Sequence, residues 1–208
     1  MVLHLIPPLL LIQTILSLPT KNTPPLYSFF GNALTLLKFL TTQRRCTMTF
    51  SDSLSQFLRD HNIHFNLTHH RPAYTAQEVA QVVHISGKDV AKTILVFADG
   101  KPLLAVLPAH HKINVSNLRD VLQVISIRLA HEDEMAQLFP SIEIGAMPPI
   151  GPMLNLPVIV AEPLTHDEEI TFNAGTHTDV IKMPYKEFEE LVHPTVADFS
   201  EYYYGKIM

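Results

Sequence analysis

The stretch Ala91-Lys92-Thr93-Ile94-Leu95-Val96-Phe97 is the most informative part of this chain for the fold. A second apolar run, Lys101 to Leu107, follows it after the pair Asp99-Gly100. An Asp-Gly pair between two such runs is the strongest short-range pattern for a β-hairpin. The sequence therefore predicts a hairpin with Lys92 at the entrance of a buried strand. Its ammonium group either reaches the surface there or supplies a fixed cation beside an anionic or ester substrate.

A segment rich in glycine and proline follows later, Gly145-Ala146-Met147-Pro148-Pro149-Ile150-Gly151. Its glycines allow positive φ, whereas its prolines fix φ and lack amide donors. Such a segment cannot be a central strand or a helix interior, so we expect a rigid, acceptor-rich loop. The loop is either a plain connector or the wall of a small pocket opposite Lys92, where its acceptors would suit a substrate ammonium group.

Lys92 in its strand, the Gly145-x-x-x-Pro149 loop and the later Phe172-Asn173-Ala174-Gly175 together resemble the YbaK/prolyl-tRNA synthetase-associated editing domain family. The similarity extends from about Leu54 to about Leu191. Members are free-standing or synthetase-inserted domains that hydrolyse the ester of wrongly charged aminoacyl-tRNA, above all tRNA for proline. The resemblance implies an α+β fold, with a mixed, mostly antiparallel sheet and flanking helices, and a reaction without a cofactor.

The resemblance also assigns roles to individual residues. Lys92 would be the catalytic residue, holding the 3′ end of the substrate near the scissile ester. Gly175, with Thr176 and His177, would form the turn that closes the site. A water molecule oriented by backbone groups and a ribose hydroxyl would attack the ester, so the protein mainly positions the reactants. The residues that would line the aminoacyl pocket and limit its size are Gly145, Ala146, Met147, Pro148, Pro149 and Gly151.

Twelve histidines raise the alternative of a metal-dependent hydrolase. They are scattered without a recognisable ligand motif, so we expect no metal site. The only cysteine, Cys46, lies outside the resembling region, and the Gly-x-Ser-x-Gly, His-Glu-x-x-His and phosphate-loop motifs are missing from the sequence. His70 ends a predicted strand just before a helix start and is a candidate for substrate binding, with a surface imidazole as the alternative.

Composition indicates one globular domain, because 47% of the 208 residues are hydrophobic and 17% are charged. The net charge of −5 hides an asymmetry: Met48 to Arg128 has eight Lys/Arg against six Asp/Glu, whereas His131 to Met208 has three against fourteen. The acceptor end of a tRNA should therefore meet the first half, unless its charges are ordinary solvated surface. The resemblance also admits an aminoacyl-tRNA synthetase as a partner. The candidate contacts for tRNA are Lys88, Lys92, Lys112, Arg119 and Arg128.

The beginning of the chain differs from the rest. Its apolar run, Leu9 to Leu18, is shorter than the ~20 residues of a membrane-spanning helix and has no basic residue before it. Three interpretations compete: upstream sequence included by a mistaken start, with Met48 the true one; an organelle or export leader; or a membrane-associating segment. We favour the first. Residues 1–47 would then be an extension, and residues 48–208 the editing domain, in the cytoplasm and without a stable membrane span.

Local patterns predict an α+β arrangement of short helices and strands. Ser51 or Ser53 would cap a helix over Leu54 to Asp60, and Thr75-Ala76-Gln77-Glu78 matches a capping box that opens a helix to about His84. Asn114 or Ser116 would cap a helix through Leu122. The other expected helices are Glu132 to Phe139 and Pro184 to Val192, and the other expected strands are His64 to Thr68, Ser126 to Ala130, Pro157 to Ala161, Glu169 to Asn173 and Asp179 to Met183.

The sequence thus predicts a trans-acting editing deacylase that binds the acceptor end of misacylated tRNA. The expected substrate is tRNA for proline carrying a wrong small amino acid. The alternative is a non-catalytic binding module of the same fold, which recognises an aminoacyl or nucleotide-like ligand or a synthetase partner. Met147-Pro148-Pro149 is more proline-rich than the commoner small-residue version of the loop, which leaves the excluded amino acid open.

Overall fold

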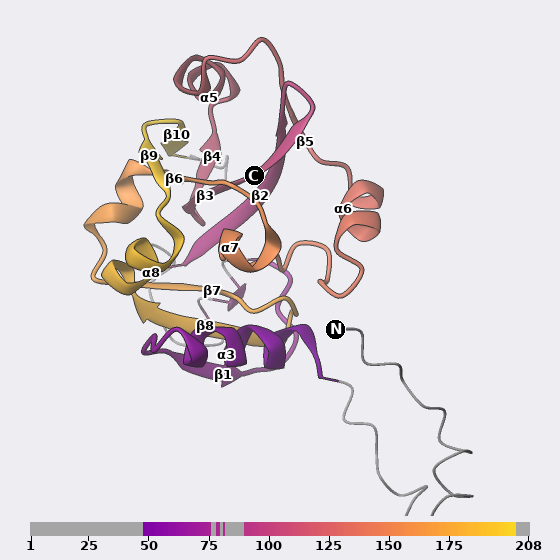
Figure 1. Ribbon diagram of the computed structural model, residues 1–208, viewed down its shortest axis with the longest axis vertical. Coiled ribbons are helices and arrows are strands. Elements are labelled where there is room, and N and C mark those ends of the chain that lie inside the picture. Colours follow the sequence, from indigo (N-terminus) through magenta and orange to yellow (C-terminus); the bar gives the residue numbers. More distant parts are fainter. Residues whose placement is uncertain (1–47, 76–77, 80, 82–89, 203–208) are drawn as a thin grey trace, which may run out of the picture. The chain divides into compact units, whose positions relative to one another are not determined.

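The computed structural model describes residues 48–75, 78–79, 81 and 90–202; the expected extension, residues 1–47, lies outside them. Three β-sheets and several short helices make up the described part (Figure 1). The strands are β1 (Asn66–His69), β2 (Ala91–Ala98), β3 (Lys101–Pro108), β4 (His111–Ile113), β5 (Ile127–Leu129), β6 (Val158–Ala161), β7 (Glu169–Asn173), β8 (Asp179–Pro184), β9 (Thr195–Ala197) and β10 (Ser200–Tyr202). The helices are α3 (Phe50–Asp60), α5 (Val115–Leu122), α6 (Glu132–Leu138), α7 (Gly151–Leu154), the 3₁₀ helix η2 (Glu162–His166) and α8 (Tyr185–Val192).

The predicted hairpin is confirmed and forms the middle of a five-stranded sheet with the order β5-β2-β3-β6-β9. β2 and β3 pair antiparallel from Ala91↔Pro108 to Ala98↔Lys101. Asp99 (φ 46°) and Gly100 (φ 78°) both have positive φ, as a two-residue type I′ turn requires. β5 extends the sheet antiparallel to β2, whereas β6 and β9 extend it parallel to β3.

A three-stranded antiparallel sheet with the order β1-β8-β7 lies next to the first sheet, and a two-stranded sheet pairs β10 with β4. An isolated parallel bridge, Val90↔Thr171, joins the chain just before β2 to β7. Parallel pairs occur at β3–β6 and β6–β9, and the other strand pairs are antiparallel. The fold is therefore α+β with mixed, mostly antiparallel sheets, as predicted.

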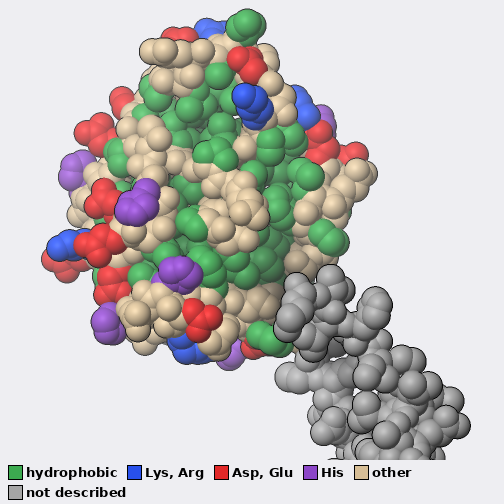
Figure 2. Space-filling view, viewed as in Figure 1, with side chains coloured by type: hydrophobic (Ala, Val, Ile, Leu, Met, Phe, Trp, Pro, Cys, Tyr) green, Lys and Arg blue, Asp and Glu red, His purple; other side chains and the backbone are tan. Residues whose placement is uncertain are grey.

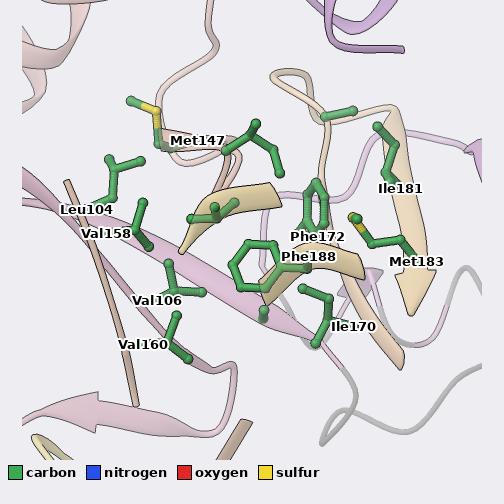
Figure 3. Packing of buried hydrophobic residues seen from close by; sticks show 14 of the residues in the cluster. Leu104, Val106, Met147, Val158, Val160, Ile170, Phe172, Ile181, Met183 and Phe188 are labelled. Carbon is green, nitrogen blue, oxygen red and sulfur yellow. The ribbon is translucent and has the colours of Figure 1, made fainter. Parts of the chain in front are cut away.

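The larger core fills the space between these two sheets (Figure 3). Leu104, Val106, Val158 and Val160 face it from the five-stranded sheet, and Ile170, Phe172, Ile181 and Met183 face it from the three-stranded sheet. Phe188 of α8 enters the same cluster and is fully buried. Burying a side chain of this size contributes roughly 1.5–3 kcal/mol. Met147 belongs to this core too, so the proline-rich loop is anchored in it.

Helix starts agree with the sequence in part. Asn114 caps α5, one of the two residues expected there, and its side chain accepts a hydrogen bond from Asn117 N. The cap of α3 is neither Ser51 nor Ser53 but Thr49, which forms a reciprocal capping box with Asp52. That pair satisfies two free N–H groups at once, which explains why the helix starts earlier than predicted.

The capping box at Thr75 is present, because Glu78 N donates to Thr75 Oγ1 (3.2 Å) and Thr75 N donates to Glu78 Oε2 (3.3 Å). Most of the helix expected after it lies outside the described residues. Gly151 was expected to end a loop but begins α7, a single turn with Pro152 near its start, where the ring is tolerated. No helix in the described part of the chain is long and apolar enough to cross a membrane.

Candidate functional site

A cavity of about 230 Å³ lies beside the first half of β2. Lys92 and Thr93 of β2 line it, together with Gly145 and Met147 of the proline-rich loop. Its other lining residues are Tyr74, Val79, Val90, Ala91, Ile94 and Asn173. The lysine and the loop that the sequence singled out therefore border one cavity.

The strand arrangement explains why space remains here. β5 covers the edge of β2 only at Val96–Ala98, and the bridge Val90↔Thr171 joins β7 to the other end of the strand. Between these points the edge of β2 faces the cavity. Backbone groups along a strand point alternately to its two neighbours. Val90 O accepts from Ala109 N on the β3 side, and Leu95 O accepts from Ala130 N on the β5 side. The backbone N–H and C=O of Thr93 therefore point away from β3, toward this free edge.

Lys92 is half-buried, and its Nζ donates a hydrogen bond to Ala109 O (3.2 Å). Burial lowers the pKa of its ammonium group below the usual range, because desolvation disfavours the charged form. No carboxylate in the described ranges contributes to the pKa of Lys92. The site thus contains a desolvated cation with one carbonyl partner, and a substrate anion or ester oxygen could interact strongly with it.

Two histidines follow Ala109 and lie near this cation. Burial lowers the pKa of His111, and the charges of His110 and Lys92 lower it further. His111 Nδ1 is 2.9 Å from Ser200 Oγ, which links β4 to β10 beside the carbonyl that holds Lys92. His111 therefore ties β10 to the segment that follows the carbonyl partner of Lys92.

The proline-rich loop is ordered by one internal hydrogen bond and by hydrogen bonds from the turn that follows β7. Gly145 has φ 89°, and Ala146 and Met147 are buried. Pro149 O accepts from Gly151 N, and two other carbonyls, Ile144 O and Ala146 O, accept from the turn that follows β7. These three carbonyls already accept hydrogen bonds within the protein, so the loop offers fewer free acceptors than its composition suggested.

Gly175 and His177 hold that turn against the loop. Gly175, with φ 90°, donates its N–H to Ala146 O (3.0 Å), and its carbonyl accepts from Glu143 N (2.9 Å). The backbone N–H of His177 donates to Glu143 Oε2 (2.6 Å), and its Nε2 lies 2.9 Å from Ile144 O. The structure thus brings the predicted turn and the predicted loop together.

Not every candidate residue reaches the cavity. Among the described residues, Gly145, Met147 and Lys92 are the predicted site residues that line it. Ala146, Pro148, Pro149 and Gly151 are buried within the loop, and the ring of His177 contacts that of Tyr74 in a tilted arrangement with 4.7 Å between the ring centroids. Thr176 uses its hydroxyl to donate to the Asp179 carboxylate, which also accepts from His69.

His70 follows β1 directly and does not line the cavity. Its backbone N–H donates to Thr178 O (2.8 Å), and its Nδ1 lies 2.6 Å from Arg71 O. Its Nε2 is buried and has no hydrogen-bond partner in the described part of the chain. The backbone of His70 therefore fastens β1 to the turn after β7, a role that sequence reasoning did not assign to it.

Seven of the ten described lining residues were not predicted as site residues, and three of these seven have polar side chains. Tyr74 lines the cavity and is 69% exposed. Thr93 and Asn173 contribute polar side chains from two strands. The alternation of side chains along β2 could have placed Thr93 next to the predicted pocket, but nothing in the sequence shows that β7 lies across from it.

The predicted basic surface is neutralised in part. Arg128 pairs with Glu134 (2.7 Å), Lys112 with Glu201 (3.1 Å) and Arg119 with Asp120 (3.5 Å), whereas Lys88 lies outside the described residues. On the face shown in Figure 2, Lys and Arg side chains are scattered among apolar and neutral surface. No group of three or more His, Cys, Asp or Glu that could hold a metal occurs in the ranges that the structure describes.

A second, larger and open hollow of about 660 Å³ lies near α3 and the three-stranded sheet. Arg59, His64 and Lys182 line it, and Glu187 and Glu169 pair with the latter two. It shares no lining residue with the cavity at Lys92. Its basic groups are engaged in pairs or lie on aromatic surface, as Arg59 does on Phe65.

Comparison with known proteins agrees with this geometry. The family model described as "aminoacyl-tRNA editing domain" matches residues 70–191. A proline–tRNA ligase of Leuconostoc citreum (strain KM20) is 23% identical over 128 residues, which cover 60% of this chain but only 22% of the ligase.

Two solved structures share the fold. A candidate trans-editing enzyme for prolyl-tRNA synthetase has a TM-score of 0.66 and 22% identity, over 73% of this chain and 97% of that one. The hypothetical protein APE2540 has a TM-score of 0.65 and 22% identity, over 71% of this chain and 99% of that one.

Proposed function

This chain belongs to the aminoacyl-tRNA editing domain family, and on that premise we propose that it is a trans-editing hydrolase that deacylates misacylated tRNA. The proposed substrate is tRNA for proline carrying a wrong small amino acid. The similarity to a proline–tRNA ligase and to a candidate trans-editing enzyme for prolyl-tRNA synthetase supports this choice of tRNA.

The observation that carries the proposal is the meeting of Lys92 with the loop at Gly145 and Met147 in one cavity. The ammonium group of Lys92 is partly desolvated and has a single carbonyl partner, Ala109 O. A phosphate oxygen at the 3′ end of a tRNA would give this cation an anionic partner, and an ester oxygen would give it a neutral acceptor.

Hydrolysis needs little more from the protein than positioning. The oxygen of a water molecule bonds to the ester carbonyl carbon, the bond from that carbon to the ribose oxygen breaks, and the ribose oxygen takes a proton. Lys92 would hold the 3′ end, and its charge would favour the negative charge that develops on the ester oxygens. The ribose hydroxyl next to the ester would help to orient the water.

The size of the cavity favours a small amino acid. Met147 is 3% exposed and is packed into the core between the sheets. Because the core is close-packed, Met147 cannot shift easily to enlarge the cavity. Gly145, which has positive φ, lines the same wall. A synthetase partner and a cytoplasmic location are part of the same proposal.

The test is a deacylation assay with the full chain. Transfer RNA for proline is charged with alanine, cysteine or serine, and release of the amino acid is followed over time. The protein should act on at least one of the three. Lys92→Ala should reduce kcat/KM by roughly tenfold or more, since each 1.4 kcal/mol of lost transition-state stabilisation is a factor of ten.

Lys101→Ala is the matched control, because Lys101 is an exposed lysine of the same hairpin. It should leave kcat/KM within about twofold of the wild type, as an exposed charge away from the site contributes little. Equal activity of Lys92→Ala and wild type would contradict the proposed role of Lys92. If every charged tRNA is stable but binds the protein, the chain is the binding module instead. Loss of activity with a chelator would indicate a metal hydrolase.

A further inference from the structure

Two polar side chains line the cavity besides Lys92: Thr93 on β2 and Asn173 at the end of β7. The hydroxyl oxygen of Thr93 and the carboxamide oxygen of Asn173 are both buried, and neither has a hydrogen-bond partner among the described residues. Native structures rarely keep such atoms unpaired unless a water or ligand completes them. The cavity therefore contains two oxygen atoms that a hydrogen-bond donor of a ligand could satisfy.

The placement of Thr93 separates it from the cation. Successive side chains leave a strand on opposite faces, so Thr93 and Lys92 project from different sides of β2. Lys92 Nζ is held on its own side by Ala109 O. Asn173 comes from the neighbouring strand β7, and in the register of the parallel bridge Val90↔Thr171 it falls opposite Lys92. Thr93 and Asn173 therefore border the cavity from two neighbouring strands, while the ammonium group of Lys92 is already bound to a carbonyl.

Several carbonyls in and beside the proline-rich loop are already engaged. Its carbonyls Ile144 O, Ala146 O and Pro149 O already accept hydrogen bonds within the protein. An ammonium group carries three N–H donors and no acceptor, and it needs oxygen atoms around it. The oxygens of Thr93 and Asn173 are the unpaired side-chain acceptors among the lining residues that the structure describes.

We propose that Thr93 and Asn173 hold the α-ammonium group of the aminoacyl ester, which makes them the residues that recognise a free amino acid moiety on the tRNA. This inference rests on the proposed function and deepens it. It assigns the 3′ end of the substrate to Lys92 and the amino group to Thr93 and Asn173. The apolar lining residues Val79, Val90 and Met147 remain for the side chain.

The test compares two esters that differ at one group. One is alanyl-tRNA for proline, and the other is lactyl-tRNA, in which a neutral hydroxyl replaces the α-ammonium group. Both are given to the full chain and to the variants Thr93→Val and Asn173→Leu, which keep the approximate side-chain shapes. Thr171→Val is the matched control, because Thr171 is 2% exposed, has an equally unpaired hydroxyl and does not line the cavity.

The wild type should hydrolyse alanyl-tRNA at least tenfold faster than lactyl-tRNA in kcat/KM. Thr93→Val and Asn173→Leu should each lose tenfold or more on alanyl-tRNA but stay within about twofold on lactyl-tRNA, because the lost contact is made only by the ammonium group. Thr171→Val should preserve the wild-type ratio. Equal losses on both esters, or no loss in either variant, would overturn the inference while leaving the proposed function intact.

A wild type that hydrolyses neither ester would overturn the proposed function, and a binding measurement then decides the inference separately. The probe is the non-hydrolysable alanyl amide of 3′-amino-3′-deoxyadenosine, titrated by calorimetry. Binding that weakens tenfold in Thr93→Val and Asn173→Leu, but not in Thr171→Val, would support ammonium recognition by a binding module. Unchanged binding in the two variants would overturn it.

Discussion

A methyl group at Gly175 should damage both the stability of the protein and its site. Gly175 has φ 90°, and a Cβ built there would lie 2.3 Å from Cδ1 of Phe50, the first residue of α3. The backbone conformation alone should cost about 1–2 kcal/mol with a side chain present. Displacing the Phe50 ring should add about 1–3 kcal/mol of overpacking. We expect Gly175→Ala to lower the free energy of unfolding by about 2–5 kcal/mol, a large share of the 5–15 kcal/mol typical of a domain.

Gly100→Ala separates the two contributions. Gly100 also has positive φ (78°), but a Cβ there would meet nothing within 4 Å. It should therefore show the backbone cost without the clash. Phe50→Ala combined with Gly175→Ala should recover most of the difference, which makes a double-mutant cycle between the turn and α3.

The assay is urea unfolding of the full-length variants followed by far-ultraviolet circular dichroism, because the chain has no tryptophan. Deacylation by Gly175→Ala should fall as well, since Gly175 is hydrogen-bonded to the loop that borders the cavity. Equal destabilisation by Gly175→Ala and Gly100→Ala, with no coupling to Phe50, would refute the close packing of the turn on α3.

Three further outcomes follow from individual residues. Gly151→Ala should destabilise the protein by about 1–3 kcal/mol in thermal unfolding, because its Cβ would lie 2.3 Å from Leu156 O and the backbone cannot yield as a side chain does. Burial raises the pKa of Tyr185 to about 12, so the folded state retains this proton longer than the unfolded state; stability should be unaffected below pH 10 and should fall as the pH rises toward 12. In Tyr185→Phe that fall should disappear, and stability at pH 7 should stay equal or rise by about 1 kcal/mol, because the hydroxyl is buried without a described partner. Hydrogen bonding from Arg128 lowers the pKa of Glu134 to about 2, and carbon-13 NMR titration should show its midpoint moving back toward 4.5 in Arg128→Ala; an unchanged midpoint would argue against that contact.

The part of the fold that the sequence predicted is local. The hairpin was predictable because Asp99-Gly100 specifies a type I′ turn irrespective of the rest of the chain. The cap at Asn114 and the capping box at Thr75 are likewise decided within four residues. The three-residue strands β4, β9 and β10 were missed, since so short a segment forms a strand only when a distant partner such as His111–Ile113 pairs with it.

The candidate site, too, was predictable only where it depends on local sequence. Lys92 and the loop around Met147 could be identified from residue types, and the structure places both at the cavity. The composition of the loop did not reveal that its carbonyls are used by Gly175 and His177, because those bonds join segments far apart in sequence. That Asn173 lines the same cavity as Thr93 could not be recognised for the same reason.

Thr93 and Asn173 are 80 residues apart in the chain, although both border the same cavity. A ribosome adds about 5–20 residues per second, so the second wall is synthesised roughly 4–16 s after the first. During that interval the edge of β2 has no β7 beside it and presents unpaired backbone groups to other nascent or finished chains. We therefore expect translation to leave this strand exposed to mispairing until β7 emerges, and a chain interrupted before Asn173 to be inactive and prone to aggregation.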